Sequence, residues 1–225
     1  MRMRATVGLL VAAILAVSAS RASSGTPAAE DCVVIEDFTK GKIGGFPPDW
    51  RPRQESGRAV YSLQVENGLR FLHAAARGIG IQAAKQYEWD LAAYPVLAWS
   101  WRPIEFPRGS DERNPRTNDS ALAVYAVFPH TYWSVKSVKY IWSAVVPAGT
   151  RLTSSAGLTQ VRVLRSGTEG AGAWAEERVN VLDDYRASFQ TAETPKPAGI
   201  AVLTDSDDTG SSAQGDYASF RACKP

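Results

Sequence analysis

Histidine and cysteine are scarce in this sequence, with two residues of each among 225. No group of these residues has the spacing of a zinc site. The sequence also lacks a Gly-x-Ser-x-Gly nucleophile elbow and the glycine patterns of a P-loop or a dinucleotide-binding turn. These absences argue against a zinc enzyme, a hydrolase with a nucleophile elbow and a nucleotide-binding protein. Candidate sites must therefore be sought among carboxylates and aromatic side chains.

An excess of positive charge is absent once the N-terminal leader described below is set aside. The full sequence has 25 Lys and Arg against 23 Asp and Glu. Cleavage after Ala19 would remove Arg2 and Arg4 and leave a net charge of zero, and cleavage after Ala22 would also remove Arg21 and leave −1. The apparent basicity belongs to the leader, and we expect no nucleic-acid partner.

The one long apolar run, residues 5–17, is shorter than the roughly 20 residues that span a bilayer. Arg2 and Arg4 precede it and small residues follow it, which is the pattern of a secretory signal peptide. We predict a signal peptide over residues 1–22 and a flexible tether over residues 23–31. The mature protein would be periplasmic or secreted, without a transmembrane segment. A retained N-terminal membrane anchor is the alternative.

The two cysteines lie at the ends of the remaining chain, because Cys32 opens it and Cys223 nearly closes it. In an oxidising compartment two such thiols are expected to pair. A disulfide between them would place the first and last strands side by side, since bonded cysteines have Cα atoms within about 7 Å of each other. Two unpaired buried thiols are the alternative.

Short β-type runs separated by Gly, Pro, Asn and Asp fill residues 32–225, with little helical periodicity. The clearest predicted hairpin turns at Asn67-Gly68, a pair that suits the positive φ angles of a type I′ turn. In the run 94–102, Trp99 and Trp101 share a face with Leu97, which predicts that both tryptophans lie in the core.

Two further elements are expected in the second half of the chain. Residues 161–165 and 174–181 should pair across a glycine-rich loop, and residues 183–189 should form one short helix with Asp183 or Asp184 as its N-cap. The whole pattern predicts a single all-β domain over residues 32–225. Its architecture would be an antiparallel β-sandwich of jelly-roll type, with about ten strands and at most one short helix.

Several segments occur in a distinctive order: PVLAWSWR at 95–102, KYIWS at 139–143, WAEER at 174–178, DDY at 183–185, IAVLTDSDDTG at 200–210 and GDY at 215–217. In this order they resemble the bacterial family catalogued as domain of unknown function 3047, over roughly residues 34–221. The resemblance implies an exported β-sandwich and no assigned chemistry. One departure is that an Arg often follows the strand-opening Asp in the family, whereas Ser120 follows Asp119 here, so any role of that Arg would be absent.

A more distant similarity concerns the acidic loop and the Gly-Asp-Tyr strand, which look like the end of galactose-binding-like jelly rolls. Many of those proteins bind glycans, and several hold a structural calcium. This likeness implies a fold and is weak support for a function.

The acidic loop at residues 205–210 is the sharpest chemical feature. Calcium takes six to eight oxygen ligands, which closely spaced carboxylates and backbone carbonyls can supply. The candidate metal ligands are Asp205, Asp207, Asp208 and Asp216, with Ca²⁺ as the one cofactor suggested. The loop lacks the spacing and closing Glu of an EF-hand, and the alternative is a turn whose Asp side chains cap its own backbone.

Loop aromatics provide the candidate ligand-binding residues. An exposed aromatic ring can stack on a sugar or an apolar ligand. Trp50, Tyr132 and Trp133 lie near or in predicted loops, and with Asp119 they form the predicted ligand site. Burial in the core is the alternative for each ring.

These features favour an exported, non-catalytic binding module for a glycan or another cell-envelope component. A structural or assembly partner in the envelope is the second hypothesis. The third is a hydrolase or lyase that acts on polysaccharide through carboxylates such as Asp119 and Asp205. The Glu-x-Asp-x-x-Glu strand of jelly-roll glucanases begins at residues 88–90 but has Ala93 at its last position, so that catalytic pair is broken.

Overall fold

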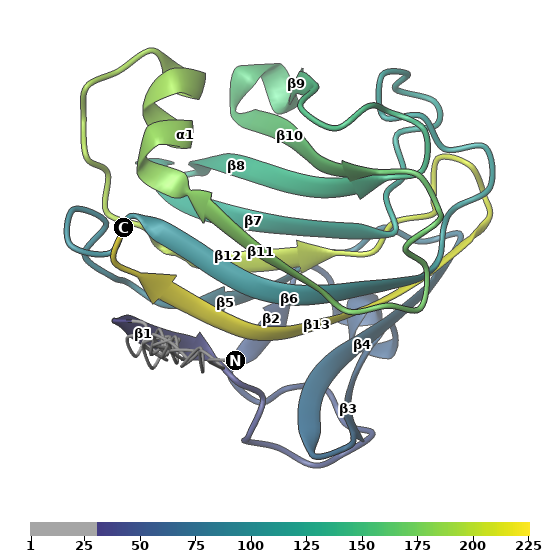
Figure 1. Ribbon diagram of the computed structural model, residues 1–225. Helices are drawn as coiled ribbons and strands as arrows, with labels where there is room; N and C mark the ends of the chain where they lie inside the picture. The colour runs from purple at the N-terminus through teal and green to yellow at the C-terminus, as the bar shows by residue number, and fades with distance from the viewer. Residues whose placement is uncertain (1–30) are drawn as a thin grey trace, which may run out of the picture.

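The computed structural model describes residues 31–225, so the predicted signal peptide and nearly all of the predicted tether lie outside the described residues. Thirteen strands form two sheets that pack as a β-sandwich (Figure 1). The sandwich confirms the predicted fold class. Within residues 31–225, no helix has both the length and the apolar character needed to cross a membrane.

The first sheet has six strands in the order β11-β6-β13-β4-β3, with β1 also paired to β13. All its pairs are antiparallel. The long strand β13 pairs with β6 on one side, and on its other side it pairs first with β4 and then with β1. The strands are β1 (Cys32–Glu36), β3 (Tyr61–Glu66), β4 (Leu69–Arg77), β6 (Val96–Glu105), β11 (Ala175–Asn180) and β13 (Ser212–Cys223).

The second sheet has seven strands in the order β2-β5-β12-β7-β8-β10-β9. Its pairs are antiparallel except for β8 and β10, which run parallel. The strands are β2 (Trp50–Pro52), β5 (Ala83–Gln86), β7 (Leu122–Thr131), β8 (Ser134–Ser143), β9 (Arg151–Ser154), β10 (Thr159–Ser166) and β12 (Gly199–Leu203). The helix α1 (Val181–Phe189) connects β11 of the first sheet with β12 of the second, and short 3-10 turns occur at η1 (Glu55–Ala59) and η2 (Ser155–Gly157).

The predicted hairpin is confirmed as β3 and β4. Asn67 and Gly68 have φ angles of 50° and 82°, both positive as a type I′ turn requires. The turn therefore fixes the register in which Glu66 lies opposite Leu69.

Aromatic rings from both sheets fill the space between them. Trp99 and Trp101 of β6 are fully buried, as predicted. Their ring centroids lie 5.6 Å from Tyr140 and 6.0 Å from Trp142, which belong to β8 of the opposite sheet. Large rings that reach across the interface supply much of the apolar area that the sandwich buries.

The two ends of the described chain meet through a disulfide. Cys32 and Cys223 are bonded, which confirms the predicted pair, and they occupy directly opposed positions of β1 and β13. Figure 1 shows β1 beside the C-terminal end of β13. The covalent bond and the strand pairing thus hold the same two segments together.

The predicted pairing of residues 161–165 with 174–181 is wrong. These residues belong to β10 and β11, which lie in different sheets: β10 pairs with β8 and β9, and β11 pairs with β6. The glycine-rich segment between them passes from one sheet to the other instead of closing a hairpin. The strands beyond the predicted ten include very short ones, such as the three residues of β2 and the four of β9.

The helix is present, but its predicted N-cap is wrong. Asn180 is the N-cap, and its side chain accepts a hydrogen bond from the backbone N–H of Asp183. Asp184 instead accepts a hydrogen bond of 2.9 Å from the hydroxyl of Tyr140. The helix begins two residues earlier than expected, at Val181, whose side chain is fully buried.

Candidate functional site

A groove crosses the strands on the outer face of the seven-stranded sheet. The strand register places Arg51, Ala84, Ala201, Tyr125 and Lys139 in one row from β2 to β8. The groove encloses about 770 Å³. A cavity of this size is within the range of small-ligand sites.

Small side chains line the groove along β5 and β12, and larger ones line it along β7 and at its two ends. Ala84, Ala198 and Ala201 line the middle. Because their side chains are short, another molecule could come close to the backbone of β5 and β12 there. Arg51 and Arg53 of the β2 segment line one end. The opposite end is formed by the β7–β8 hairpin and by residues around η2, where the hydroxyls of Ser137 and Thr159 are 3.0 Å apart.

Two exposed aromatic rings stand at the tip of the β7–β8 hairpin. Tyr132 and Trp133 are 88% and 89% exposed, and both line the groove. Their ring centroids are 4.4 Å apart at an interplanar angle of 81°. The turn that carries them is held by a 2.6 Å hydrogen bond between the hydroxyls of Thr131 and Ser134. Tyr132 and Trp133 therefore stand exposed at one end of the groove.

Beside the groove, part of this face is covered by protein. Val146 and Leu152 pack over outward-facing residues of β8 and β10, including Ile141 and Val163. The groove is consequently confined to the part of the face between β2 and the β7–β8 hairpin. Packing sets this boundary, because the covered residues belong to a second apolar cluster that continues into the groove lining at Tyr125 and Ala201.

A buried charged cluster adjoins the groove next to Tyr125. Lys139 is 6% exposed, and its Nζ lies 5.6 Å from the centroid of the Tyr125 ring. Glu112 is also buried and accepts hydrogen bonds from the hydroxyls of Ser120 at 3.0 Å and Ser143 at 2.5 Å. Burial raises the pKa of Glu112 above its ordinary value, while those hydrogen bonds oppose the rise.

The acidic loop between β12 and β13 folds over Asp119, which lies just before β7. Asp119 is fully buried and accepts hydrogen bonds from the backbone N–H groups of Asp208 at 3.2 Å and Thr209 at 2.8 Å. One carboxylate oxygen each from Asp119, Asp207 and Asp208 lie within 4.8 Å of one another. The fold therefore brings Asp119 to the acidic loop.

Asp205 lies beside these carboxylates, with Asp207 as its nearest acidic neighbour. Its exposure is 8%, and its Oδ1 has no hydrogen-bond partner. Burial, together with the neighbouring Asp207, raises the pKa of Asp205 to about 8. An unpartnered oxygen beside other carboxylates is costly unless a proton or a cation compensates it.

Asp216 does not join this cluster, so the predicted metal set is corrected at this position. Its carboxylate is fully buried in β13 and pairs with His73 Nδ1 and Arg102 Nε, each at 2.7 Å. Both of its oxygens are therefore engaged on the six-stranded sheet. The Gly-Asp-Tyr segment uses its Asp to hold β4, β6 and β13 together.

Trp50 and Asp119 are also corrected as ligand-binding residues. Trp50 is 2% exposed, and its Nε1 donates a 2.9 Å hydrogen bond to Glu36. It begins β2 with its ring against Phe38, in the interior. Asp119 is fully buried beneath the acidic loop, and it does not line the groove.

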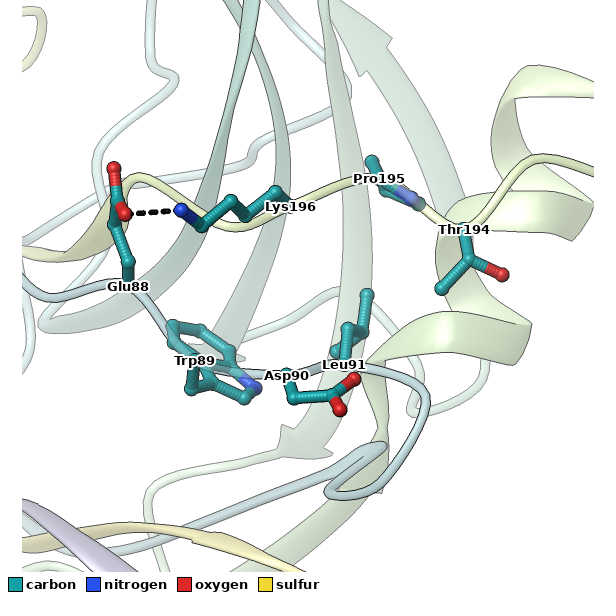
Figure 2. Close-up of a pocket in the computed structure, with 7 residues that line it drawn as sticks. All are labelled: Glu88, Trp89, Asp90, Leu91, Thr194, Pro195 and Lys196. Atoms are coloured by element: carbon teal, nitrogen blue, oxygen red, sulfur yellow. Dashed lines mark ion pairs between the residues drawn. The ribbon is translucent and has the colours of Figure 1, made fainter.

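A second, smaller cavity of about 400 Å³ lies between the β5–β6 and α1–β12 connections. Figure 2 shows the ion pair of Glu88 with Lys196, which links the two segments. Trp89 is buried and donates to the carbonyl of Tyr94, and Asp90 accepts from the amide of Ala92. Because these polar groups already have partners, this cavity is the weaker candidate for a ligand.

The groove contains several polar residues that the sequence did not indicate, since they come from segments far apart in the chain and follow no motif. They are Arg51, Arg53, Gln82, Ser137 and Thr159. Only the strand register brings them together, and a single sequence does not reveal register between distant strands.

Comparison with solved structures finds proteins of low identity and low TM-score. One is a carbohydrate-binding module, CBM28, specific for non-crystalline cellulose, with a TM-score of 0.42 and 12% identity over 83% of this chain and 97% of that one. Another is the mannan-recognising module TmCBM27, with a TM-score of 0.35 and 13% identity over 82% and 96% of the two chains. A third is the family 11 xylanase from Neocallimastix patriciarum, with a TM-score of 0.37 and 10% identity over 81% and 95%.

Comparison with curated proteins finds no match. The family described as "Protein of unknown function (DUF3047)" matches residues 48–221, which is most of the chain. The match spans both sheets, from just before β2 to within β13. The chain therefore belongs to the DUF3047 family.

Proposed function

We propose that this protein is an exported binding module that holds a glycan chain in the groove on the outer face of the seven-stranded sheet. The observation that carries the proposal is the pair of almost fully exposed rings, Tyr132 and Trp133, at one end of a groove lined with polar donors. Aromatic rings supply flat apolar surface for the faces of sugar rings. Hydroxyl, amide and guanidinium groups along the groove would bond the sugar hydroxyls.

The shape of the groove suits an extended chain. It runs across β2, β5, β12, β7 and β8, and its floor of alanines leaves room above the sheet. The lining supplies donors and aromatic faces rather than the paired carboxylates that glycoside hydrolysis uses. This composition favours binding over catalysis.

Charge at the β2 end favours an acidic glycan. Arg51 and Arg53 are both exposed, and within the described part of the chain neither forms an ion pair. A guanidinium group binds a carboxylate through two parallel hydrogen bonds. A uronic-acid unit at this end would therefore add affinity that falls as salt is added.

Export is part of the proposal and is supported by the predicted leader and by the Cys32–Cys223 disulfide. Disulfides persist mainly in oxidising compartments. A fractionation of cells that express the full chain tests this part. Recovery of the disulfide-bonded protein in the cytoplasm, with its leader intact, would contradict it.

Binding is tested by affinity electrophoresis and calorimetry on neutral polysaccharides, acidic polysaccharides and peptidoglycan. We expect Trp133→Ala to lower the affinity for the bound polysaccharide by about tenfold or more, as truncation of an aromatic anchor does. Ile104→Ala is the matched control, since Ile104 is exposed on the six-stranded sheet. The proposal fails if the wild type binds no member of the panel, or if Trp133→Ala binds as tightly as the control.

A second candidate function is assembly with another envelope protein. Val135 is 49% exposed next to Tyr132 and Trp133, so the hairpin tip presents a small apolar surface. Exposed apolar clusters often mark protein contacts. Crosslinking from a photoreactive residue at position 133 distinguishes the two: a protein adduct that is not displaced by any polysaccharide would favour assembly.

A further inference from the structure

We propose that Asp119, Asp205, Asp207 and Asp208 form a calcium-binding site at the β12–β13 loop. The site is distinct from the groove, whose lining contains none of these residues. One oxygen from each of Asp119, Asp207 and Asp208 lies within 4.8 Å of the others. The buried Asp205 adds an oxygen that lies beside Oδ1 of Asp207, next to Gly80. The expected role of the ion is to fix the acidic loop against the start of β7.

An oxygen without a donor provides an observation independent of the clustering. Asp205 is 92% buried, yet its Oδ1 accepts no hydrogen bond. Its backbone is fixed, because its N–H donates to the carbonyl of Ser120 at 3.0 Å. Folding therefore places a buried ligand atom in a set position and leaves it without a protein partner, which is the state expected of a metal ligand.

Gly80 shows where that oxygen points. A Cβ placed on Gly80 would lie 2.0 Å from Oδ1 of Asp205 and 2.7 Å from Oδ1 of Asp207. The two oxygens thus crowd the same point beside a residue that has no side chain. The absence of a side chain at Gly80 allows both carboxylates to turn inward together.

Asp119 has capacity left for an ion although it also caps the loop. Its Oδ2 accepts from the amide and hydroxyl of Thr209, whereas its Oδ1 accepts a single longer bond from the amide of Asp208. A carboxylate has about four acceptor positions. A purely structural turn would explain the bonds of Asp119, but it would require Asp205 and Asp207 to share a proton where a cation could instead bind both carboxylates.

The donor set selects calcium over magnesium. Four carboxylates and nearby carbonyls fit the six to eight oxygen ligands that calcium takes in flexible geometry. Magnesium keeps several waters and is usually held by only one or two carboxylates. Calcium is also the ion that an exported protein meets at useful concentration, if the proposed export is correct.

The test uses the mature, disulfide-bonded protein freed of metal with EDTA and then titrated with CaCl₂ or MgCl₂. We expect one saturable calcium site by calorimetry. At a free calcium concentration about 100 times the Kd, the melting temperature should rise by about 5–10 °C. Magnesium should give a smaller shift at the same concentration.

Three variants separate a metal site from a general charge effect. Asp207→Asn changes an exposed ligand and should remove most of the calcium shift. Asp205→Asn should keep the melting temperature measured in EDTA but lose the calcium shift, because its amide can donate to Asp207. Glu169→Gln removes an exposed carboxylate elsewhere and should retain the full shift. No shift in the wild type, or an equal shift in Asp207→Asn and Glu169→Gln, would overturn the proposal.

Discussion

Removal of the Cys32–Cys223 disulfide tests how much of the sandwich's stability depends on covalent closure. The change is a double variant, Cys32→Ala with Cys223→Ala, which leaves no free thiol. The bond spans a sequence separation of 191 residues. A crosslink of that span removes entropy from the unfolded chain worth about 5 kcal/mol in the loop-closure treatment.

The measured loss in the free energy of unfolding should be smaller than this upper limit. β1 keeps its backbone pairing with β13 through Val33 and Val34, and Ile35 remains packed in the core. Native disulfides typically contribute about 2–5 kcal/mol. For a domain of this size such a change lowers the melting temperature by about 4–20 °C.

Thermal and urea unfolding, followed by circular dichroism, provide the assay. Wild type reduced by TCEP should match the double variant, whose own melting temperature should not respond to TCEP. The reasoning is refuted if the variant melts within about 1 °C of the oxidised wild type. It is also refuted if TCEP lowers the melting temperature of the variant as much as that of the wild type.

Three further predictions follow from single residues. Gly80→Ala should lower the calcium affinity measured by calorimetry by about tenfold or more, because its Cβ displaces the carboxylates of Asp205 and Asp207; an unchanged affinity would contradict the proposed geometry. Tyr217→Phe should lower the free energy of unfolding in urea by about 1–3 kcal/mol, since the buried hydroxyl donates to the carbonyl of Leu203 at 2.8 Å; no measurable loss would show that the bond is replaced. Asn180→Ala should cost about 1 kcal/mol through loss of the α1 cap, and Asn180→Asp should restore it; equal melting temperatures for the two variants would count against the cap.

The features that could be predicted from sequence are those encoded by neighbouring residues. Asn67-Gly68 fixes a turn through its own φ angles, so the β3–β4 hairpin followed directly. The alternation of side chains along β6 likewise depends on neighbouring residues alone, and it correctly predicted that Trp99 and Trp101 lie in the core. Cys32 and Cys223 are far apart in sequence, but with only two cysteines present just one intramolecular pairing exists.

The sequence did not predict features that depend on which strands pair with one another. Residues of β10 and β11 are separated by a flexible-looking glycine-rich loop, which suggested a hairpin. The observed partners are β8 for β10 and β6 for β11, and both choices are set by which sheet each strand completes. Parallel pairing of β8 with β10 needs a crossover connection, and no local turn signal encodes it.

Trp50 illustrates a different limit. Its neighbours Phe46, Pro47, Pro48 and Asp49 predict a loop, and the backbone is irregular up to that point. The side chain nevertheless lies inside because Glu36 and Phe38 of the β1 segment provide a polar partner and an aromatic neighbour. A residue next to a loop can therefore be core whenever a distant segment supplies its partners, which composition alone does not show.

The two candidate sites differ in how far the sequence predicts them, because one is nearly contiguous and the other is assembled from several strands. Asp205, Asp207 and Asp208 are nearly contiguous in the acidic loop, so the sequence indicated them together. Only the fold shows that the distant Asp119 joins them and that Asp216 does not. The groove takes alternate residues of β7, from Tyr125 to Thr131, but only one or two residues each from β2, β5, β12 and β10. Residues scattered over separate strands carry no pattern that joins them in the sequence. Only its end at the β7–β8 hairpin, Tyr132-Trp133, is contiguous, and this is the part that the sequence indicated. For a surface that crosses a sheet, the sequence can therefore indicate the residues of its turns. The residues that its strands contribute are known only once the register between those strands is known.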